Sequence, residues 1–282
     1  MNQRLEPPAS PFERHESLLT ERTLAYRHAP SLEAGAPAAV FLHGLGGSAL
    51  NWTDFMGRMR SQLDCYAIDL HGFGASPPPR DGDMSPAGHA RAVTDFIVEH
   101  ELGPVHLFGN SMGGAIAVQL AARRPDLARS LTLISPALPN LRYATKGNVH
   151  LPVISVPGIG ERLIPKFVET TTPEQRMQAT IDGTFADPSR LSDVRFAEAV
   201  EEIRMRDSRP YAHDSFLQSL RGCCVPTSIA ARTGLGNSPS GSKHPRCWCT
   251  GARIHSSIRA PPTGRPSASP TRTSWCCPTV VT

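Results

Sequence analysis

Residues 105–114 constrain the fold of this chain more than any other stretch, because they join a strand pattern to a helix pattern through a serine flanked by glycines. They read V-H-L-F-G-N-S-M-G-G, and a helical pattern follows at residues 115–124. The spacing G-x-S-x-G between a strand and a helix predicts a sharp turn with Ser111 at its apex. We expect this turn to hold the serine in a sparsely populated backbone region, at a cost of roughly 1–3 kcal/mol. Gly109 and Gly113 are needed because a Cβ there would collide with the crossing strand and helix.

Two other loops combine a strand pattern with closely spaced glycines. Residues 39–42 read A-V-F-L and lead into H-G-L-G-G-S at residues 43–48. Residues 66–69 read Y-A-I-D and lead into L-H-G-F-G-A-S at residues 70–76. In their order and their distances from Ser111, these segments resemble the exits of two central strands in the α/β-hydrolase fold family.

The resemblance covers about residues 19–220 and agrees with the wider pattern of the chain. Strand patterns alternate with helical patterns of about 10–15 residues, which predicts an α/β fold with a mostly parallel sheet, right-handed crossovers and flanking helices. The expected strands are 38–42, 63–68, 105–108 and 130–135, preceded by an antiparallel edge hairpin at 19–28, and the expected core helices are 51–63, 85–101 and 115–124. Ligands in such sheets bind at the carboxyl ends of the strands, where His43, Asp69 and Ser111 fall.

We expect four parts along the chain. They are a polar N-terminal arm (1–18), an α/β-hydrolase core (19–136), a helical cap (137–214), and residues 215–282, in which the end of a cap helix leads into an aberrant basic, cysteine-rich tail. The cap reads as helical around 160–170, 173–181, 188–202 and 211–220. Eight apolar cap residues are candidates either for a substrate pocket or for ordinary packing: Leu151, Val153, Ile154, Val156, Ile159, Phe167, Met177 and Phe185.

The family resemblance implies a chemistry for the site. Ser111 is expected to be the nucleophile of a cofactor-free, metal-free serine hydrolase that cleaves an ester, lactone or related acyl bond. The backbone N–H groups of Leu45 and Met112 are expected to form the oxyanion hole. Four glycines of the elbow and the loop are expected to allow close approach of the backbone: Gly44, Gly46, Gly109 and Gly113.

Three polar residues at the strand ends receive structural roles. We expect His43 to support its loop rather than to act as the general base. Asp69 and His71 are expected to pack and hydrogen-bond within the 72–76 loop. A serine rather than an aspartate at position 111 argues against the dehalogenase and epoxide-hydrolase chemistries of the family.

The last part of the chain breaks the family pattern, in which an acid and then a histidine follow the serine. All 25 Asp and Glu lie at or before Asp214, and residues after Leu220 carry eight basic side chains and six of the seven cysteines. The two parts therefore have net charges of −4 and +8.

A change of reading frame explains this composition. Read in the next frame, residues 243–262 can give A-P-A-L-L-V-Y-G-R-A-D-P-L-V-D-P-R-A-A, and residues 273–282 can give V-V-V-L-P-D-G-G-H. These segments resemble the strand exits that carry the acid, across codons 253 and 254, and the base, across codons 281 and 282. We infer a frameshift near residues 221–223, and we expect the last two strands and the C-terminal helix to be missing or disordered and the product to be inactive or aggregation-prone.

Two other interpretations stay open. The chain is either a non-catalytic hydrolase-fold binding protein, or its cysteine-rich tail is a metal-binding appendage, although adjacent cysteine pairs do not match the usual C-x₂₋₄-C spacing. No secretory pattern is visible in residues 1–13 and no apolar run approaches 18 residues, so we expect a cytoplasmic protein without a membrane span. The expected partner is a small ester-like substrate, and neither nucleic acid nor membrane; the sequence does not indicate an oligomeric state.

Overall fold

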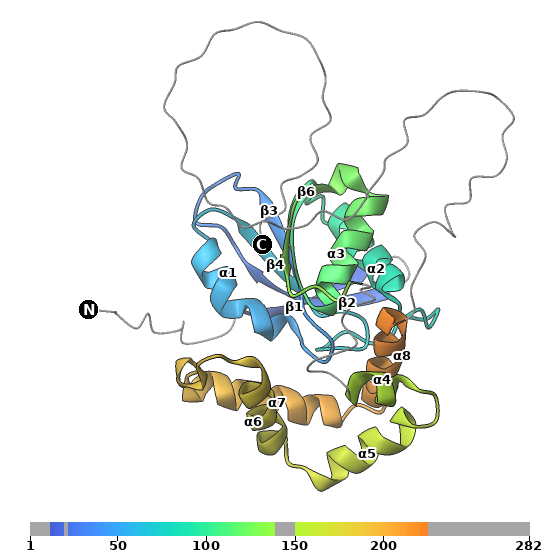
Figure 1. Cartoon of the computed structure of the whole chain (residues 1–282). Helices are drawn as coiled ribbons and strands as arrows, with labels where there is room; N and C mark the ends of the chain where they lie inside the picture. The colour runs from blue at the N-terminus through green and yellow to red at the C-terminus, as the bar shows by residue number, and fades with distance from the viewer. Residues whose placement is uncertain (1–11, 20–21, 139–149, 225–282) are drawn as a thin grey trace, which may run out of the picture. The chain divides into compact units, whose positions relative to one another are not determined.

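The computed structural model describes residues 12–19, 22–138 and 150–224, and its sheet is mostly parallel, as the alternating pattern predicts (Figure 1). The strand order is β1-β2-β4-β3-β5-β6. The parallel part pairs β4 with β3, β3 with β5 and β5 with β6, whereas β1 and β2 form an antiparallel hairpin that joins the sheet at β4. The strands are β1 (Arg14–Leu19), β2 (Arg22–Ala29), β3 (Ala38–Leu42), β4 (Asp64–Ile68), β5 (Val105–Asn110) and β6 (Ala128–Ile134).

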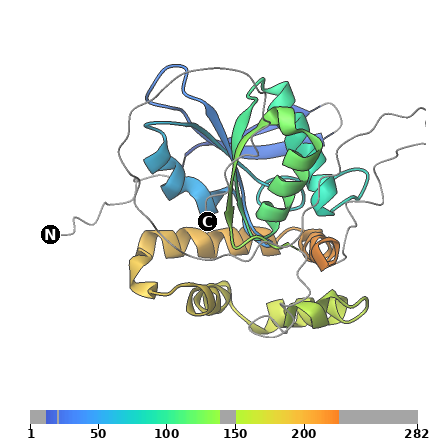
Figure 2. The same ribbon diagram turned by 45° about the horizontal axis from the view of Figure 1, so that its top comes forward.

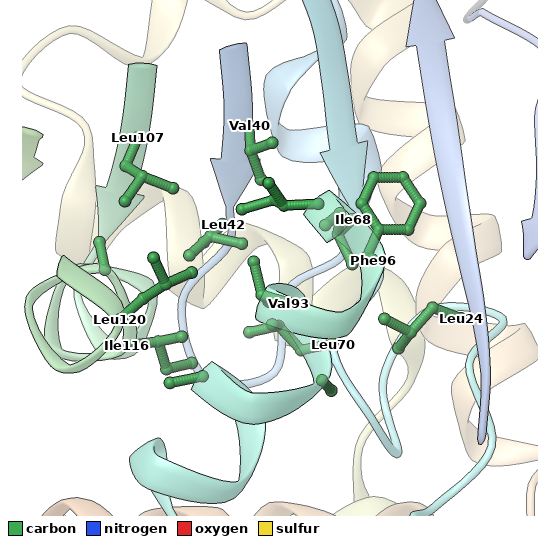
Figure 3. Packing of buried hydrophobic residues seen from close by; sticks show 14 of the residues in the cluster. Leu24, Val40, Leu42, Ile68, Leu70, Val93, Phe96, Leu107, Ile116 and Leu120 are labelled. Atoms are coloured by element: carbon green, nitrogen blue, oxygen red, sulfur yellow. The ribbon is translucent and has the colours of Figure 1, made fainter. Parts of the chain in front are cut away.

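Both faces of the central strands are buried, which is why β3 is apolar throughout rather than alternating. Val40 and Leu42 point to the face covered by α2 (Pro86–Glu99) and α3 (Met112–Arg123), where Figure 3 shows them with Leu107 and Ile116. Ala39 and Phe41 point to the other face, which is covered by the 3₁₀ helix η1 (Ala49–Trp52) and by α1 (Thr53–Met59). Each such large apolar side chain contributes about 1.5–3 kcal/mol when fully buried.

Helix α2 shows how local signals and packing agree. Ser85 caps its first turn by accepting a hydrogen bond from the Gly88 N–H, and Pro86 occupies the first helical position. Ala90, Val93, Phe96 and Ile97, which recur at helical spacing, are at most 2% exposed. The predicted start of this helix is therefore confirmed.

The segment predicted to form the cap and the start of the tail contain five helices among the described residues: α4 (His150–Ser155), α5 (Gly160–Thr170), α6 (Pro173–Thr184), α7 (Asp193–Asp207) and α8 (Ala212–Cys224). The predicted range of α5 is confirmed, but α7 begins five residues after the predicted start at 188. Residues 188–190 form a separate 3₁₀ turn, and the Ser192 hydroxyl starts α7 by accepting from the Arg195 N–H. The short helix α4 was not predicted, because Pro152 reads as a helix breaker. Pro152 lies in the first turn of α4, where backbone N–H groups have no acceptor within the helix, so the missing N–H of proline costs no hydrogen bond there.

Two core boundaries also differ from the prediction. Strand β1 begins at Arg14, inside the segment expected to be a polar arm, because an edge strand needs only one buried side and here buries Ser17 and Leu19. Helix α1 is shorter than expected, because Ser48 and Asn51 form a capping box that starts a 3₁₀ turn at Ala49. The rest of the arm at 1–11, the start of the cap at 139–149, and the tail at 225–282 lie outside the described residues, and with them the expected loss of the last two strands and the C-terminal helix.

Strand β6 lies at the end of the described sheet. Among the described residues it pairs with β5 alone, and its side chains are half-buried or exposed, with Ile134 at 43% exposure. The predicted cap also exposes apolar residues: Val153, Val156, Ile159, Phe167 and Phe185 are 39–53% exposed. Among the described residues these five do not belong to the buried core, and their role in lining a substrate pocket stays a prediction. None of the helices in the described ranges has the length and apolarity to cross a membrane.

Candidate active site

The turn between β5 and α3 has the strained geometry that the sequence predicts. Ser111 adopts φ 51° and ψ −114°, a left-handed φ that a residue with a side chain rarely adopts. Neighbouring backbone groups hold it there. The Ser111 N–H donates to the Ile134 carbonyl at 3.0 Å, and the Ser111 carbonyl accepts from the Ala137 N–H at 2.8 Å. The end of β6 therefore fixes the serine from one side and α3 from the other.

The two glycines of the motif are required by close backbone contacts. A Cβ on Gly113 would lie 2.6 Å from the carbonyl carbon of Leu42 and 2.7 Å from the carbonyl oxygen of His43. A Cβ on Gly109 would lie 2.6 Å from the carbonyl carbon of Gly113. Because these atoms belong to the backbone, they cannot rotate away. The predicted collision with the crossing strand and helix is confirmed at both positions.

The loop at residues 43–48 lies directly against Ser111. A Cβ on Gly44 would be 3.3 Å from the Ser111 Cβ and 2.9 Å from the Asn110 side-chain oxygen. The loop closes a turn through a 3.0 Å hydrogen bond from the Gly47 N–H to the Gly44 carbonyl, with Gly46 at φ 76°. A turn of this kind favours glycine at its third residue.

The predicted oxyanion donors flank this contact. Met112 is the first residue of α3, a position at which the N–H has no acceptor within the helix. Leu45 is the second residue of the Gly44–Gly47 turn, and its N–H donates to no backbone acceptor in the described part of the chain. The structure thus brings the loop and the helix start to the same serine. The roles of Leu45 and Met112 as donors stay predictions.

His43 supports the loop, as expected, and is not placed as a general base. Its Nε2 accepts from the Leu70 N–H at 3.0 Å, and its Nδ1 donates to the Gly44 carbonyl at 2.7 Å, so both ring nitrogens are used by backbone groups. The ring is fully buried, and this burial lowers the pKa of His43, although the Gly44 bond and the Asp69 charge oppose the shift. A neutral imidazole is the form that satisfies both bonds.

Asp69 ties the two glycine-rich loops together. One carboxylate oxygen accepts from the Ala49 N–H at 2.7 Å, and the other accepts from the Ala75 N–H at 2.8 Å. The side chain is 2% exposed. Gly74 lies so close to the carboxylate that any side chain there would displace it. The predicted role of Asp69 in its loop is confirmed, and its link to Ala49 was not foreseen.

Helix α8 contacts a third histidine in this region. His89 of α2 lies within hydrogen-bond distance of the Ser219 hydroxyl, at 3.3 Å, and its ring is 6.5 Å from that of His71. Burial, together with the nearby His71 and His43, lowers the pKa of His89 to about 3. His71 uses its Nδ1 within the loop, 3.2 Å from the Pro77 carbonyl, and burial lowers its pKa as well. These histidines are packing groups of the loops behind the serine.

Small residues let α8 approach so closely. A Cβ on Gly72 would lie 2.6 Å from the Ser215 Cβ, and a Cβ on Gly222 would lie 2.9 Å from the Ser85 Cα. Ser215, Ser219 and Gly222 recur at intervals of four and three residues, on one face of the helix. This spacing was the signal in the sequence that could have indicated the contact.

Within the described residues the Ser111 hydroxyl has no hydrogen-bond partner. A serine nucleophile needs a base in contact with its hydroxyl and an acid behind that base. The codons from which we inferred both groups, 253–254 and 281–282, lie outside the described residues. In the same described part of the chain, no group of three or more His, Cys, Asp or Glu is arranged to hold a metal ion.

Comparison with known proteins agrees with this geometry. The family model described as "alpha/beta hydrolase fold" matches residues 37–171. The curated relative "Putative esterase NocK" of Nocardia uniformis subsp. tsuyamanensis is 32% identical over 237 residues, which cover 74% of this chain and 67% of that protein. The chain therefore belongs to the α/β-hydrolase fold family.

Two further likenesses agree with that membership. "Probable lysophospholipase BODYGUARD 4" of Arabidopsis thaliana is 32% identical over 122 residues, or 42% of this chain and 29% of that protein. The chain thus spans about a third of the length of the first curated relatives that it matches. The solved structure of Cfl2 wild-type from Burkholderia cenocepacia has a TM-score of 0.63 at 18% identity, covering 77% of this chain and 73% of that one, and shows the fold alone.

Proposed function

We propose that this chain carries the site of a serine hydrolase that cleaves an ester, lactone or related acyl bond of a small molecule. The observation that carries the proposal is the strained Ser111, with the Gly44–Gly47 turn packed against it at van der Waals distance. A backbone held at such a cost is typical of sites where the strain presents a reactive side chain. The relative named as an esterase supports the same reaction class.

In this proposal the Ser111 oxygen attacks the acyl carbonyl carbon, and the oxygen of that carbonyl becomes negatively charged. The N–H groups of Leu45 and Met112 donate to this oxygen, and one such donor stabilises the transition state by about 3–4 kcal/mol. The carbon–oxygen bond to the alcohol part then breaks, which leaves an acyl-enzyme and the free alcohol, and the alcohol takes up the proton that the serine gave to the base. Water then hydrolyses the acyl-enzyme and releases the acid. The hydroxyl of serine is a weak nucleophile unless a base takes its proton, so the base sets the rate.

The inferred frameshift bears on that base. As printed, the chain has no Asp or Glu after Asp214, and its only later histidines, His244 and His255, lie in no strand-exit motif. A well-formed serine site that lacks triad members still accelerates hydrolysis on the order of 10³–10⁴-fold over water. We therefore propose that the printed chain is impaired and hydrolyses esters slowly at most, and that the chain read in the other frame after residues 221–223 is the full enzyme. A cytoplasmic location stays part of this proposal.

The test combines labelling and turnover. The printed chain is incubated with a fluorophosphonate probe, with the Ser111→Ala variant as its control, and the modified peptide is identified by mass spectrometry. We expect slow modification of Ser111 in the printed chain and none in the variant. Labelling elsewhere, or equal labelling of the variant, would contradict the assignment of the nucleophile.

The frame is tested at the level of DNA. The coding sequence is determined again from codon 215 onward, and a chain with one base inserted or deleted at codons 221–223 is expressed beside the printed one. We expect the frame-restored chain to hydrolyse p-nitrophenyl butyrate at least about 10²-fold faster, since removing triad members costs orders of magnitude in kcat. Equal rates for the two chains would show that the tail does not supply the acid and the base.

A further inference from the structure

Helix α7 presents a polar stripe to the core. Arg195, Glu202 and Arg206 are spaced by seven and four residues and therefore lie on one face of the helix. At one end of the stripe, Arg195 binds the carboxylate of Asp54 on α1, with its Nη2 2.6 Å and its Nε 3.1 Å from Oδ1. At the other end, Arg206 reaches the loop beside Ser111. Figure 2 shows the helix itself, in light orange, beside the core. Helix α7 therefore contacts both ends of the segment 46–54, which runs from the glycine-rich loop to α1.

The contact of Arg206 is specific and unusual. Its Nη1 donates to the Gly46 carbonyl at 2.9 Å, and a Cβ on Gly46 would lie 3.5 Å from this nitrogen and 3.5 Å from the Phe216 ring. The guanidinium and the ring therefore cover the third residue of the Gly44–Gly47 turn. No acidic side chain in the described residues forms an ion pair with Arg206 within 4 Å, and burial lowers its pKa.

The charges around Arg206 do not explain why this side chain is half-buried. Asp207 and Glu202 attract the guanidinium, but Asp207 is already bound to Arg176, and the charge of Arg176 repels that of Arg206. Glu202 is itself half-buried, and burial together with the Asp69 charge raises its pKa. Removing a charged group from water is costly unless it makes compensating bonds. Within the described residues, Arg206 makes one hydrogen bond to the core, and its acceptor is the Gly46 carbonyl of the loop.

We infer that Arg206 is a positioning residue, which holds the Gly44–Gly47 turn in the conformation that places the Leu45 N–H beside Ser111. The inference rests on the proposed function, because the turn matters as part of an oxyanion hole. Helix α7 would then couple the docking of the cap to the completion of the site. When the Gly46 carbonyl loses its donor, the turn can rotate, and the Leu45 N–H moves with it.

The first test reads the loop itself and needs no activity. Hydrogen–deuterium exchange of the full chain is followed by mass spectrometry for the parent, Arg206→Met, Arg206→Lys and Arg204→Met. Arg204 is the matched control, since it lies on the same helix at 53% side-chain exposure and binds Glu174 and Glu201 instead of the core. We expect exchange in the peptide covering residues 43–50 to rise about tenfold in Arg206→Met, in part in Arg206→Lys, and not in Arg204→Met.

Exchange in peptides from β3 and β5 distinguishes a local effect on the loop from a general loss of stability. If exchange in Arg206→Met rises at the loop alone, Arg206 holds the turn. If it rises equally in β3 and β5, or does not rise at the loop, the inference is wrong.

The second test links the turn to Ser111. A displacement of about 1 Å in a positioned group can cost up to about 10²-fold in rate. We therefore expect the fluorophosphonate to modify Ser111 at least about tenfold more slowly in Arg206→Met than in Arg204→Met, with partial recovery in Arg206→Lys. Equal labelling rates would refute the link to the oxyanion hole. If the parent chain is not labelled at all, the proposed function fails instead, and the exchange experiment alone decides the role of Arg206.

Discussion

Replacing Gly113 by alanine tests whether close backbone contact or helix propensity dominates at the turn. Gly113 is the second residue of α3, and in an ordinary helix interior alanine is more stable than glycine by about 0.5–1 kcal/mol. Propensity alone therefore predicts a more stable protein. The contact with the end of β3 predicts the opposite.

The structure gives the size of the opposing term. The new Cβ would lie 2.6 Å from the Leu42 carbonyl carbon and 2.7 Å from the His43 carbonyl oxygen. Ordinary contact between such atoms is about 3.5 Å, so β3 and α3 must separate by nearly 1 Å. Overpacking of this kind costs about 1–3 kcal/mol, and more where backbone must move. After subtraction of the propensity gain, we expect a net loss of up to about 2.5 kcal/mol, toward the upper end because backbone must move.

The control is Gly183→Ala in α6, where nothing lies within 4 Å of the added Cβ. That variant should gain about 0.5–1 kcal/mol. The free energy of unfolding of both variants and the parent is measured by urea denaturation, and the melting temperatures should differ by about 2–4 °C per kcal/mol. A Gly113→Ala variant at least as stable as Gly183→Ala would refute the reasoning from backbone contact.

Two further predictions concern buried polar groups. Because the pKa of His89 falls to about 3 in the folded chain, while an unfolded histidine titrates near 6.5, the unfolded state binds more protons between these values, and stability falls as the pH drops. His89→Gln should make the free energy of unfolding less dependent on pH, by up to about 1.4 kcal/mol per pH unit. Urea unfolding from pH 7.5 to 5 measures this dependence, and an unchanged dependence in the variant would contradict the lowered pKa of His89. Asp69→Asn turns one of two carboxylate acceptors into a donor that faces a backbone N–H, and we expect a loss of about 1–3 kcal/mol. The exposed Asp126→Asn should leave the melting temperature unchanged, and an equal effect of the two variants would show that the bonds of Asp69 are not needed.

The parts of this protein that the sequence predicts are those whose physical cause is local. The elbow at Ser111 follows from glycines two residues before and after it, because each excludes a Cβ at a backbone crossing. Strand β3 follows from an unbroken apolar run, and the start of α2 follows from Ser85 and Pro86. Predicting the class of fold, the turn at Ser111 and the loop beside it therefore needs no knowledge of distant contacts.

Tertiary structure decided the contacts between segments far apart in the chain. Arg206 meets Gly46 across 160 residues, Arg195 meets Asp54 across 141, and His89 meets Ser219 across 130. No periodicity in either partner indicates the other, since each contact depends on how α7 and α8 dock on the core. Whether an arginine of α7 contacts a loop of the core or lies in solvent is therefore settled only by packing, because the cost of removing its charge from water is offset by an acceptor far away in the chain.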